Sequence, residues 1–208
     1  MNIFGRFFIL VFFSALLSTP SYADSPSFTY AELEYIANGD FAVSDGNLSV
    51  DLSLDGYALN LSGELGIFVI QASRFELQSS RIFNSNLEDS ISTIALGLNF
   101  EFPQTSVYGL VRGRRDELSL VAGGFGADEE GSSVGFETGV RFNVTDRVEL
   151  NANLGRPSLD EGSSFGVGGQ FYVTKNIGIT VDFNSIEIED NDITAQFDTT
   201  SIGLRFNF

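Results

Sequence analysis

The chain has 208 residues, of which 28 are acidic, 11 are basic and none is histidine or cysteine. The negative charge disfavours nucleic acid as a partner, and the missing cysteine excludes a small scaffold held by disulfides. Without imidazole and thiol groups the usual bases, nucleophiles and zinc ligands are absent, so we expect no catalytic residue, cofactor or metal site.

Residues 1–23 have the features of a secretory signal peptide. Arg6 precedes an apolar run over 7–17, and Ser21, Tyr22 and Ala23 form a small-x-small cleavage signature. The run is shorter than the roughly 20 residues that a spanning helix needs, so a retained anchor is the weaker interpretation. We expect export, cleavage after Ala23 and one domain over residues 24–208.

The remaining sequence alternates with the period of β-strands. Val148, Leu150, Ala152 and Leu154 alternate with polar residues, which gives one lipid-compatible face and one wet face. The same pattern over the rest of the chain predicts ten strands, with eight as the alternative count. They are expected at residues 28–37, 52–63, 67–77, 89–100, 106–114, 133–142, 148–154, 163–173, 177–184 and 202–208.

The connections between these strands alternate in length. Short connections are expected at 64–66, 101–105, 143–147 and 174–176, and long ones near 38–51, 78–88, 115–132, 157–162 and 185–196. Short periplasmic turns with longer extracellular loops are typical of outer-membrane barrels. The predicted fold is therefore an all-β, transmembrane, antiparallel up-and-down β-barrel. A soluble secreted sandwich or lipocalin-like barrel is the alternative, because it also alternates.

Aromatic residues gather beside the predicted short turns, where a girdle would meet the membrane interface. The residues expected in this girdle are Phe28, Tyr30, Phe68, Phe100, Phe102, Tyr108, Phe142, Phe171, Tyr172, Phe206 and Phe208. Tyr35, Tyr57, Phe136 and Phe165 are expected in the girdle at the opposite interface. The facing of residues 67–77 and 106–114 is ambiguous, because neither alternate set is cleanly apolar.

Charged and amide side chains on the wet face must point into the lumen, since an arginine facing mid-membrane hydrocarbon costs about 2–4 kcal/mol. The predicted lumenal residues are Glu32, Glu34, Glu137, Arg141, Glu149, Asn151, Asn153, Asp182 and Arg205. Closure places the first and last strands side by side, so we expect Arg205 to pair with Glu32 or Glu34.

A hairpin around residues 143–147 predicts further lumenal neighbours. Symmetric pairing of Phe142 with Val148 would place Arg141 opposite Glu149, and Glu137 opposite Asn153. A small barrel with so many inward side chains is largely filled, which disfavours a general diffusion pore.

Three acidic runs, 128–130, 160–161 and 187–192, are expected in loops. They are interpreted as a solvated rim, with calcium or magnesium bridging to lipopolysaccharide phosphates as the weaker alternative. The apolar stretch 118–125 would fold inward, contact a partner or extend its hairpin.

The chain ends in an alternating strand with a terminal aromatic residue. Ile202, Leu204, Phe206 and Phe208 are expected to form the assembly signal for the barrel-assembly machinery. We therefore expect a monomer in the cell outer membrane, surrounded by outer-membrane lipid and lipopolysaccharide.

Four segments carry a family resemblance: 28–35 (FTYAELEY), 144–150 (VTDRVEL), 169–179 (GQFYVTKNIGI) and 202–208 (IGLRFNF). The chain resembles the small porin-like barrel family that includes the quorum-signal-regulated xanthomonad outer-membrane proteins once named activators of plant immunity. The resemblance spans nearly the whole mature chain and carries over no site residue. It implies a non-enzymatic outer-membrane or vesicle protein associated with biofilm and motility.

Two functions follow from these observations. The leading hypothesis is a structural or cell-surface interaction role, in which a filled barrel holds acidic loops toward the outside. The rival is a narrow passive channel for ions or small solutes.

Overall fold

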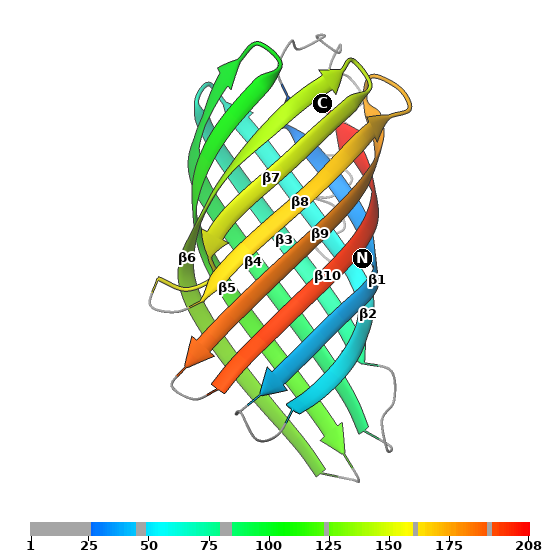
Figure 1. Ribbon diagram of the computed structural model, residues 1–208, viewed down its shortest axis with the longest axis vertical. Coiled ribbons are helices and arrows are strands. Elements are labelled where there is room, and N and C mark those ends of the chain that lie inside the picture. Colours follow the sequence, from blue (N-terminus) through cyan, green and yellow to red (C-terminus); the bar gives the residue numbers. More distant parts are fainter. Residues whose placement is uncertain (1–25, 45–48, 80–84, 123–124, 160–161, 191–192) are drawn as a thin grey trace, which may run out of the picture.

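The computed structural model describes residues 26–44, 49–79, 85–122, 125–159, 162–190 and 193–208. These residues form a closed antiparallel barrel of ten strands, in which consecutive strands pair and β1 pairs with β10 (Figure 1). The strands are β1 (Tyr30–Ser44), β2 (Ser49–Leu65), β3 (Phe68–Ser79), β4 (Ser85–Phe102), β5 (Thr105–Ala122), β6 (Phe125–Thr145), β7 (Val148–Arg156), β8 (Ser163–Tyr172), β9 (Ile177–Asp190) and β10 (Ile193–Asn207). The predicted fold class and the count of ten strands are confirmed.

The two ends of the barrel differ. One end, here called the short-turn end, carries the tight connections 66–67, 103–104, 146–147 and 173–176. Gly66 there has a φ of 62°, a conformation that glycine adopts without steric cost. At the opposite hairpin end, β4, β5 and β6 project well beyond the short strands β7 and β8 (Figure 1).

This asymmetry between the ends agrees with the predicted pattern, but most residues predicted in long connections belong to strands. Residues 115–122 and 125–132, for example, extend β5 and β6, which pair without interruption up to Ala122 and Phe125. Beyond the belt of outward apolar residues both faces of a hairpin meet water, so the hydropathy alternation stops while backbone pairing continues. The strand ends were therefore not visible in the sequence. Within the described residues, no helix is long and apolar enough to cross a membrane.

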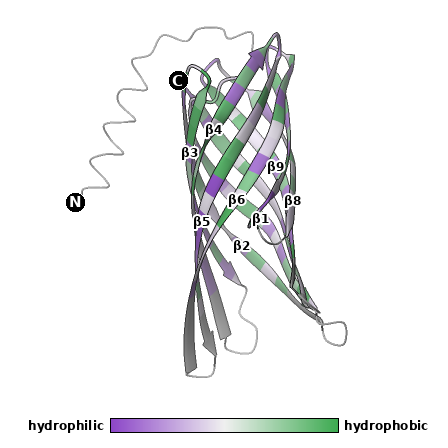
Figure 2. Cartoon of the chain, turned by 90° about the vertical axis from the view of Figure 1, so that its left-hand side faces the viewer, coloured by the Kyte–Doolittle hydropathy of each residue, from purple (hydrophilic) through white to green (hydrophobic). Residues whose placement is uncertain are grey.

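The outward apolar belt ends at a defined row of residues on β3 to β6. Ala72, Ile94, Gly113 and Val134 are cross-strand neighbours in its last row. Two residues further along each strand, the outward row is Arg74, Ser92, Arg115 and Ser132. Figure 2 shows hydrophobic and hydrophilic residues alternating along the strands between the two ends.

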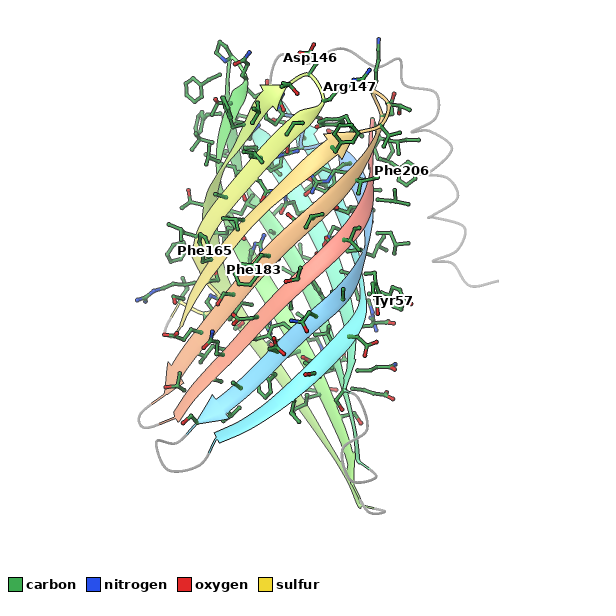
Figure 3. The ribbon with its side chains drawn as sticks, turned by 45° about the vertical axis from the view of Figure 1, so that its right-hand side comes forward. Tyr57, Asp146, Arg147, Phe165, Phe183 and Phe206 are labelled. Carbon is green, nitrogen blue, oxygen red and sulfur yellow. The ribbon has the colours of Figure 1, made fainter. Side chains whose placement is uncertain are left out.

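The aromatic girdles are present only in part. Tyr57, Phe165 and Phe183 project outward from the barrel (Figure 3). The other outward aromatic residues include Phe68, Phe100, Phe102, Phe142 and Phe171 toward the short-turn end, and Tyr35 and Phe136 further along. Phe206 and Phe208 are half-buried.

Four of the predicted girdle residues do not face outward. Phe28 and Tyr108 are buried inside the barrel, and Tyr30 and Tyr172 contact lumenal charged groups. Their placement in the girdle was wrong because closeness to a turn does not fix facing. The alternation of their strands does, and Tyr30 shares the parity of the inward Glu32.

The ambiguous strands β3 and β5 also alternate in the structure. Val69 and Leu77 on β3, and Tyr108 and Leu110 on β5, are buried inside, while Phe68, Ile70 and Val111 face outward. Part of the lumen is apolar, so hydrophobic residues occupy both faces of these strands. This explains why hydropathy alone did not reveal their facing.

The register between β6 and β7 differs from the predicted one by two residues. A bulge between Asn143 and Thr145 pairs Phe142 with Leu150 rather than Val148. Arg141 consequently lies opposite Asn151, and Glu137 lies opposite Gly155. A shift of two residues keeps the facing of every side chain, so both residues still point inward.

Candidate functional site

All nine residues proposed for the lumen lie on the inner side of the barrel. Glu32, Glu34, Glu137, Arg141, Glu149 and Arg205 are buried. Asn151, Asn153 and Asp182 are half-buried and line the internal cavity. Six of the nine form direct pairs: Glu32 with Arg205, Arg141 with Glu149, and Asn151 with Asp182. Glu34 and Glu137 bind other lumenal side chains.

The seam between β1 and β10 holds the first pair. Glu32 and Arg205 are direct cross-strand neighbours, and Arg205 Nη2 lies 2.7 Å from Glu32 Oε2. The Arg205 guanidinium also donates to Gln170 Oε1 at 3.1 Å and lies 4.2 Å from the centre of the Tyr30 ring. The predicted ion pair across the seam is thus present, with Glu32 and not Glu34 as its acid.

A second pair lies beside it. Arg141 donates through Nε to Glu149 Oε1 at 2.7 Å and through Nη1 to the backbone oxygen of Ser27 at 2.5 Å. The Tyr172 hydroxyl donates to the other Glu149 oxygen at 2.8 Å. The Arg141 guanidinium lies 4.6 Å from the centre of the Phe28 ring. The segment before β1 therefore folds across the barrel mouth and is held there by Arg141.

These two pairs form one network, because Arg205 Nη1 lies 3.9 Å from Glu149 Oε1. We call Glu32, Arg141, Glu149 and Arg205 the charged plug. The side chains of the four residues are no more than 8% exposed, although an open aqueous channel would leave lumenal charges in contact with water. Two acids and two bases balance one another, which satisfies the requirement that buried charges be paired. The plug closes the short-turn end.

Glu137 belongs to a neighbouring group. Glu137 Oε1 accepts a hydrogen bond from the Tyr108 hydroxyl at 3.0 Å. Glu137 Oε2 forms an ion pair with Arg112 Nη2 at 2.8 Å. The Tyr108 ring packs edge-on against Phe28, with 5.0 Å between ring centres. Gly139 provides the space for this ring, since a Cβ there would lie 2.6 Å from Tyr108 Cζ. Tyr108, Arg112 and Glu137 therefore fill the part of the lumen next to the charged plug.

Glu34 and Asp182 are held by neutral donors. Glu34 accepts from the Ser201 hydroxyl and the Asn60 amide, and Asp182 accepts from the Asn151 amide at 3.2 Å. Both carboxylates line an internal cavity of about 260 Å³. Asn153 lines the same cavity from β7.

The lumen changes character toward the hairpin end. A buried apolar cluster of Ile36, Leu54, Ala58, Leu77 and Ile91 lies there, with Phe41, Phe75 and Phe197 packed against it. The sequence did not single out this cluster, because the alternation was interpreted as one lipid-compatible face and one wet face, with polar side chains in the lumen. Strand parity measured from Glu32 could have placed Ile36 inside, and parity measured from Arg205 could have placed Phe197 inside.

The acidic runs are not all in loops. Residues 128–130 lie in β6 and 187–190 in β9, while 160–161 and 191–192 fall outside the described residues. Glu130 forms an ion pair with Arg115 Nη2 at 2.9 Å. Among the described residues, no group of three or more acidic side chains is arranged to hold a metal ion.

The final strand is longer than predicted, because β10 begins at Ile193. Ile202 and Leu204 are about half exposed on the outer face of β10. Phe206 is half-buried and lies on the same outer face (Figure 3). The Phe208 amide donates to the backbone oxygen of Thr29 at 3.1 Å, which ties the chain end to the residues before β1.

Comparison with known proteins gives matches of structure only. Neither a protein-family model nor a curated protein matches the sequence. Among solved structures, the outer membrane protease OmpT from Escherichia coli matches with a TM-score of 0.58 and 11% identity, over 86% of this chain and 96% of that chain. The translocator domain of the autotransporter NalP from Neisseria meningitidis matches with a TM-score of 0.52 and 9% identity, over 98% and 94%.

Neisserial surface protein A matches with a TM-score of 0.49 and 13% identity, over 88% of this chain and 98% of that chain. At these identities, the two likenesses above a TM-score of 0.5 concern the fold alone. The chain has the closed antiparallel barrel that is found in outer-membrane proteins.

Proposed function

We propose that this chain is a non-enzymatic cell-surface protein, in which a closed outer-membrane barrel carries an extended sheet for contact with a partner. One observation supports the proposal above all. Strands β4, β5 and β6 have 18, 18 and 21 residues, whereas a membrane-spanning strand needs about 9–11. The surplus continues past the outward row of Arg74, Ser92, Arg115 and Ser132, where β4 stays paired with β5 and β5 with β6.

We call residues 85–92, 115–122 and 125–132 the paddle. Most described side chains of the paddle are polar: Glu117 and Glu130 are exposed outside, and Asp116 is about one-third exposed on the inner side. The apolar exceptions are Ile91, which is buried at the lumenal base of the paddle, and Leu118, which is exposed. Apart from Ile91, none of the described paddle side chains is buried, so this sheet contributes little to stability. Its length is better explained by contact with something outside the membrane than by the needs of the fold.

Catalysis has little support in the lumen. The chain has no histidine or cysteine, and the plug carboxylates are occupied by arginine and hydroxyl donors. A general base needs a free lone pair within reach of a substrate. The protease activity named for OmpT is therefore not part of the proposal.

The belt and its border support a place in the outer membrane. Arg74 and Arg115 lie in one outward row directly above the belt, and both side chains are more than half exposed. At this depth they would meet the phosphates of lipopolysaccharide, which arginine binds well. We also propose export by residues 1–23, insertion by the barrel-assembly machinery, a monomeric state, and a relation to the small porin-like xanthomonad proteins.

A narrow channel is the second candidate, and the cavity of about 260 Å³ is the observation that favours it. Conduction would require the charged plug to open, because the cavity is covered at the short-turn end by buried ion pairs. Such pairs resist separation in a site without water.

The experiment is a shortening of the paddle. Asp116 and Gly131 are cross-strand partners, so residues 117–130 can be replaced by Asn-Gly, a two-residue turn that suits antiparallel strands. Cells that carry the short protein should lose attachment or biofilm mass down to the level of cells without the gene. Heat-modifiable gel migration of the membrane fraction would check that the barrel still folds.

A matched control shortens a different hairpin. Glu187 and Gln196 are partners on β9 and β10, so residues 188–195 can be replaced in the same way. These cells should attach as the parent does. Parental attachment of the paddle-shortened cells would overturn the proposed function.

A further inference from the structure

Strand β6 has an unpaired edge beyond the membrane. It has 21 residues, whereas its neighbour β7 has nine, and their pairing stops at Phe136 and Arg156. The chain after β7 reaches slightly further, since the Leu159 amide donates to the Val134 oxygen at 2.8 Å and the Ser133 hydroxyl donates to the Pro157 oxygen. Within the described part of the chain, nothing pairs with residues 125–132 on this side.

The backbone groups that this edge presents can be assigned. In an antiparallel pair, the N–H and C=O groups of alternate residues point to the same side of the strand. The Val134 oxygen points toward β7, and no bulge interrupts β6 from there to Phe125. Gly126, Asp128, Glu130 and Ser132 therefore direct their four amides and four carbonyls away from β5, toward the open side.

We propose that this edge binds an extended segment of another polypeptide, which adds to the paddle as a further strand. An unpaired edge is a ready template for strand addition, because each added residue pair makes main-chain hydrogen bonds without rearrangement of the sheet. The edge lies beyond the apolar belt, where a partner outside the membrane can reach it. This inference rests on the proposed surface role and names the chemistry of the partner.

The negative charge of this edge indicates that the added segment is basic. The sequence of residues 126–133 is GADEEGSS, with three acids and no base, in a chain with a net charge of −17. A second copy would bring two acidic edges together, and like charges on neighbouring strands repel. The partner is therefore a different chain, rich in lysine or arginine and able to extend.

The test uses the full chain in lipid nanodiscs and a capped peptide of four Lys-Val repeats as the probe. The same peptide with every backbone amide N-methylated has the same charge but has no N–H to donate to a ladder. Binding is measured by fluorescence anisotropy, and amide hydrogen exchange is followed by NMR. Strand addition should protect the amides of Gly126, Asp128, Glu130 and Ser132, and the N-methylated peptide should protect none of them.

Two variants at one position separate strand addition from attraction of charge. Glu130→Pro removes an amide that points to the open edge, so it leaves the pairing with β5 intact, and Glu130→Ala removes the same charge while keeping that amide. Both lose the ion pair with Arg115 equally. We expect Glu130→Pro to weaken binding of the Lys-Val peptide at least about tenfold, and Glu130→Ala to change it less than about threefold.

Equal binding by the two variants, or binding without protection of the edge amides, would overturn the inference. These results do not depend on the attachment assay, so the two proposals can fail separately. If paddle shortening abolishes attachment but the edge amides stay unprotected, the surface role stands and the strand-addition mode is wrong. If the peptide adds as a strand but attachment is unaffected by paddle shortening, the edge stands and the surface role is wrong.

Discussion

Strands β5 and β6 pass through two environments. Toward the short-turn end, Tyr108, Glu137 and Arg141 are buried among aromatic and charged groups in the lumen. Toward the hairpin end, Glu117 and Glu130 on the same strands are at least half exposed. The backbone ladder is continuous between the two regions, so pairing alone does not distinguish a stable barrel wall from a projecting paddle. The difference lies in the side chains, which form a plug at one end and leave the strands available for contact at the other.

The largest expected effect is at the plug. Arg205→Ala would leave Glu32 buried without its cation, and removal of one partner of a buried pair costs about 3–5 kcal/mol. Urea unfolding of the protein refolded in lipid vesicles measures the loss. The double variant Glu32→Gln with Arg205→Met should recover part of it, because no unpaired charge remains. A loss below about 1 kcal/mol for Arg205→Ala would mean that the plug is not a stabilising network.

A smaller effect is expected where the lumen is tightly packed. A Cβ on Gly139 would lie 2.6 Å from Tyr108 Cζ and 2.8 Å from the backbone oxygen of Ala152, so Gly139→Ala should destabilise by about 1–3 kcal/mol. Gly109 is the matched control, because a Cβ there meets no atom within 4 Å. Equal unfolding free energies for the two variants would contradict a filled lumen.

The smallest effect is expected in the paddle. Burial, together with the nearby Asp116 carboxylate, raises the pKa of Asp89 above its ordinary value, so ionisation of Asp89 opposes pairing at neutral pH. Stability should increase as the pH falls from the raised pKa toward the ordinary one, since the folded state then binds more protons. Asp89→Asn should remove this pH dependence and stabilise the paddle by less than about 1 kcal/mol at neutral pH.

Hydrogen exchange of the paddle amides measures this effect, because the paddle can open while the barrel stays folded. The plug amides serve as the internal reference and should be unchanged. Slower exchange of the paddle in the parent protein than in Asp89→Asn at neutral pH would contradict the assigned role of Asp89.

The same contrast explains what could be predicted from the sequence. Strands that separate lipid from a polar lumen alternate clearly, as Val148 to Leu154 do, and the inward facing of Glu32 and Arg205 follows from their strands. Ion pairing across the seam could be anticipated because closure makes the first and last strands neighbours.

The features that could not be predicted lack such a contrast. The described side chains of residues 115–119 and 130–132 are exposed or half-buried on both faces, so the continuation of β5 and β6 leaves no clear hydropathy alternation. On β3 and β5 both faces are partly apolar, so Val69 and Leu110 could not be assigned to the lumen. The bulge between Asn143 and Thr145 shifts the β6–β7 register by two residues, and a shift of two leaves facing and hydropathy unchanged.

Conductance in planar lipid bilayers tests the central claim most directly. The account predicts no reproducible current steps for the purified chain, because Arg141, Arg205, Glu32 and Glu149 close the short-turn end. The double variant Arg141→Ala with Arg205→Ala removes both cations of the plug and should admit current if it remains folded. Steady ion conduction by the unaltered chain would contradict the closed lumen and favour the narrow channel.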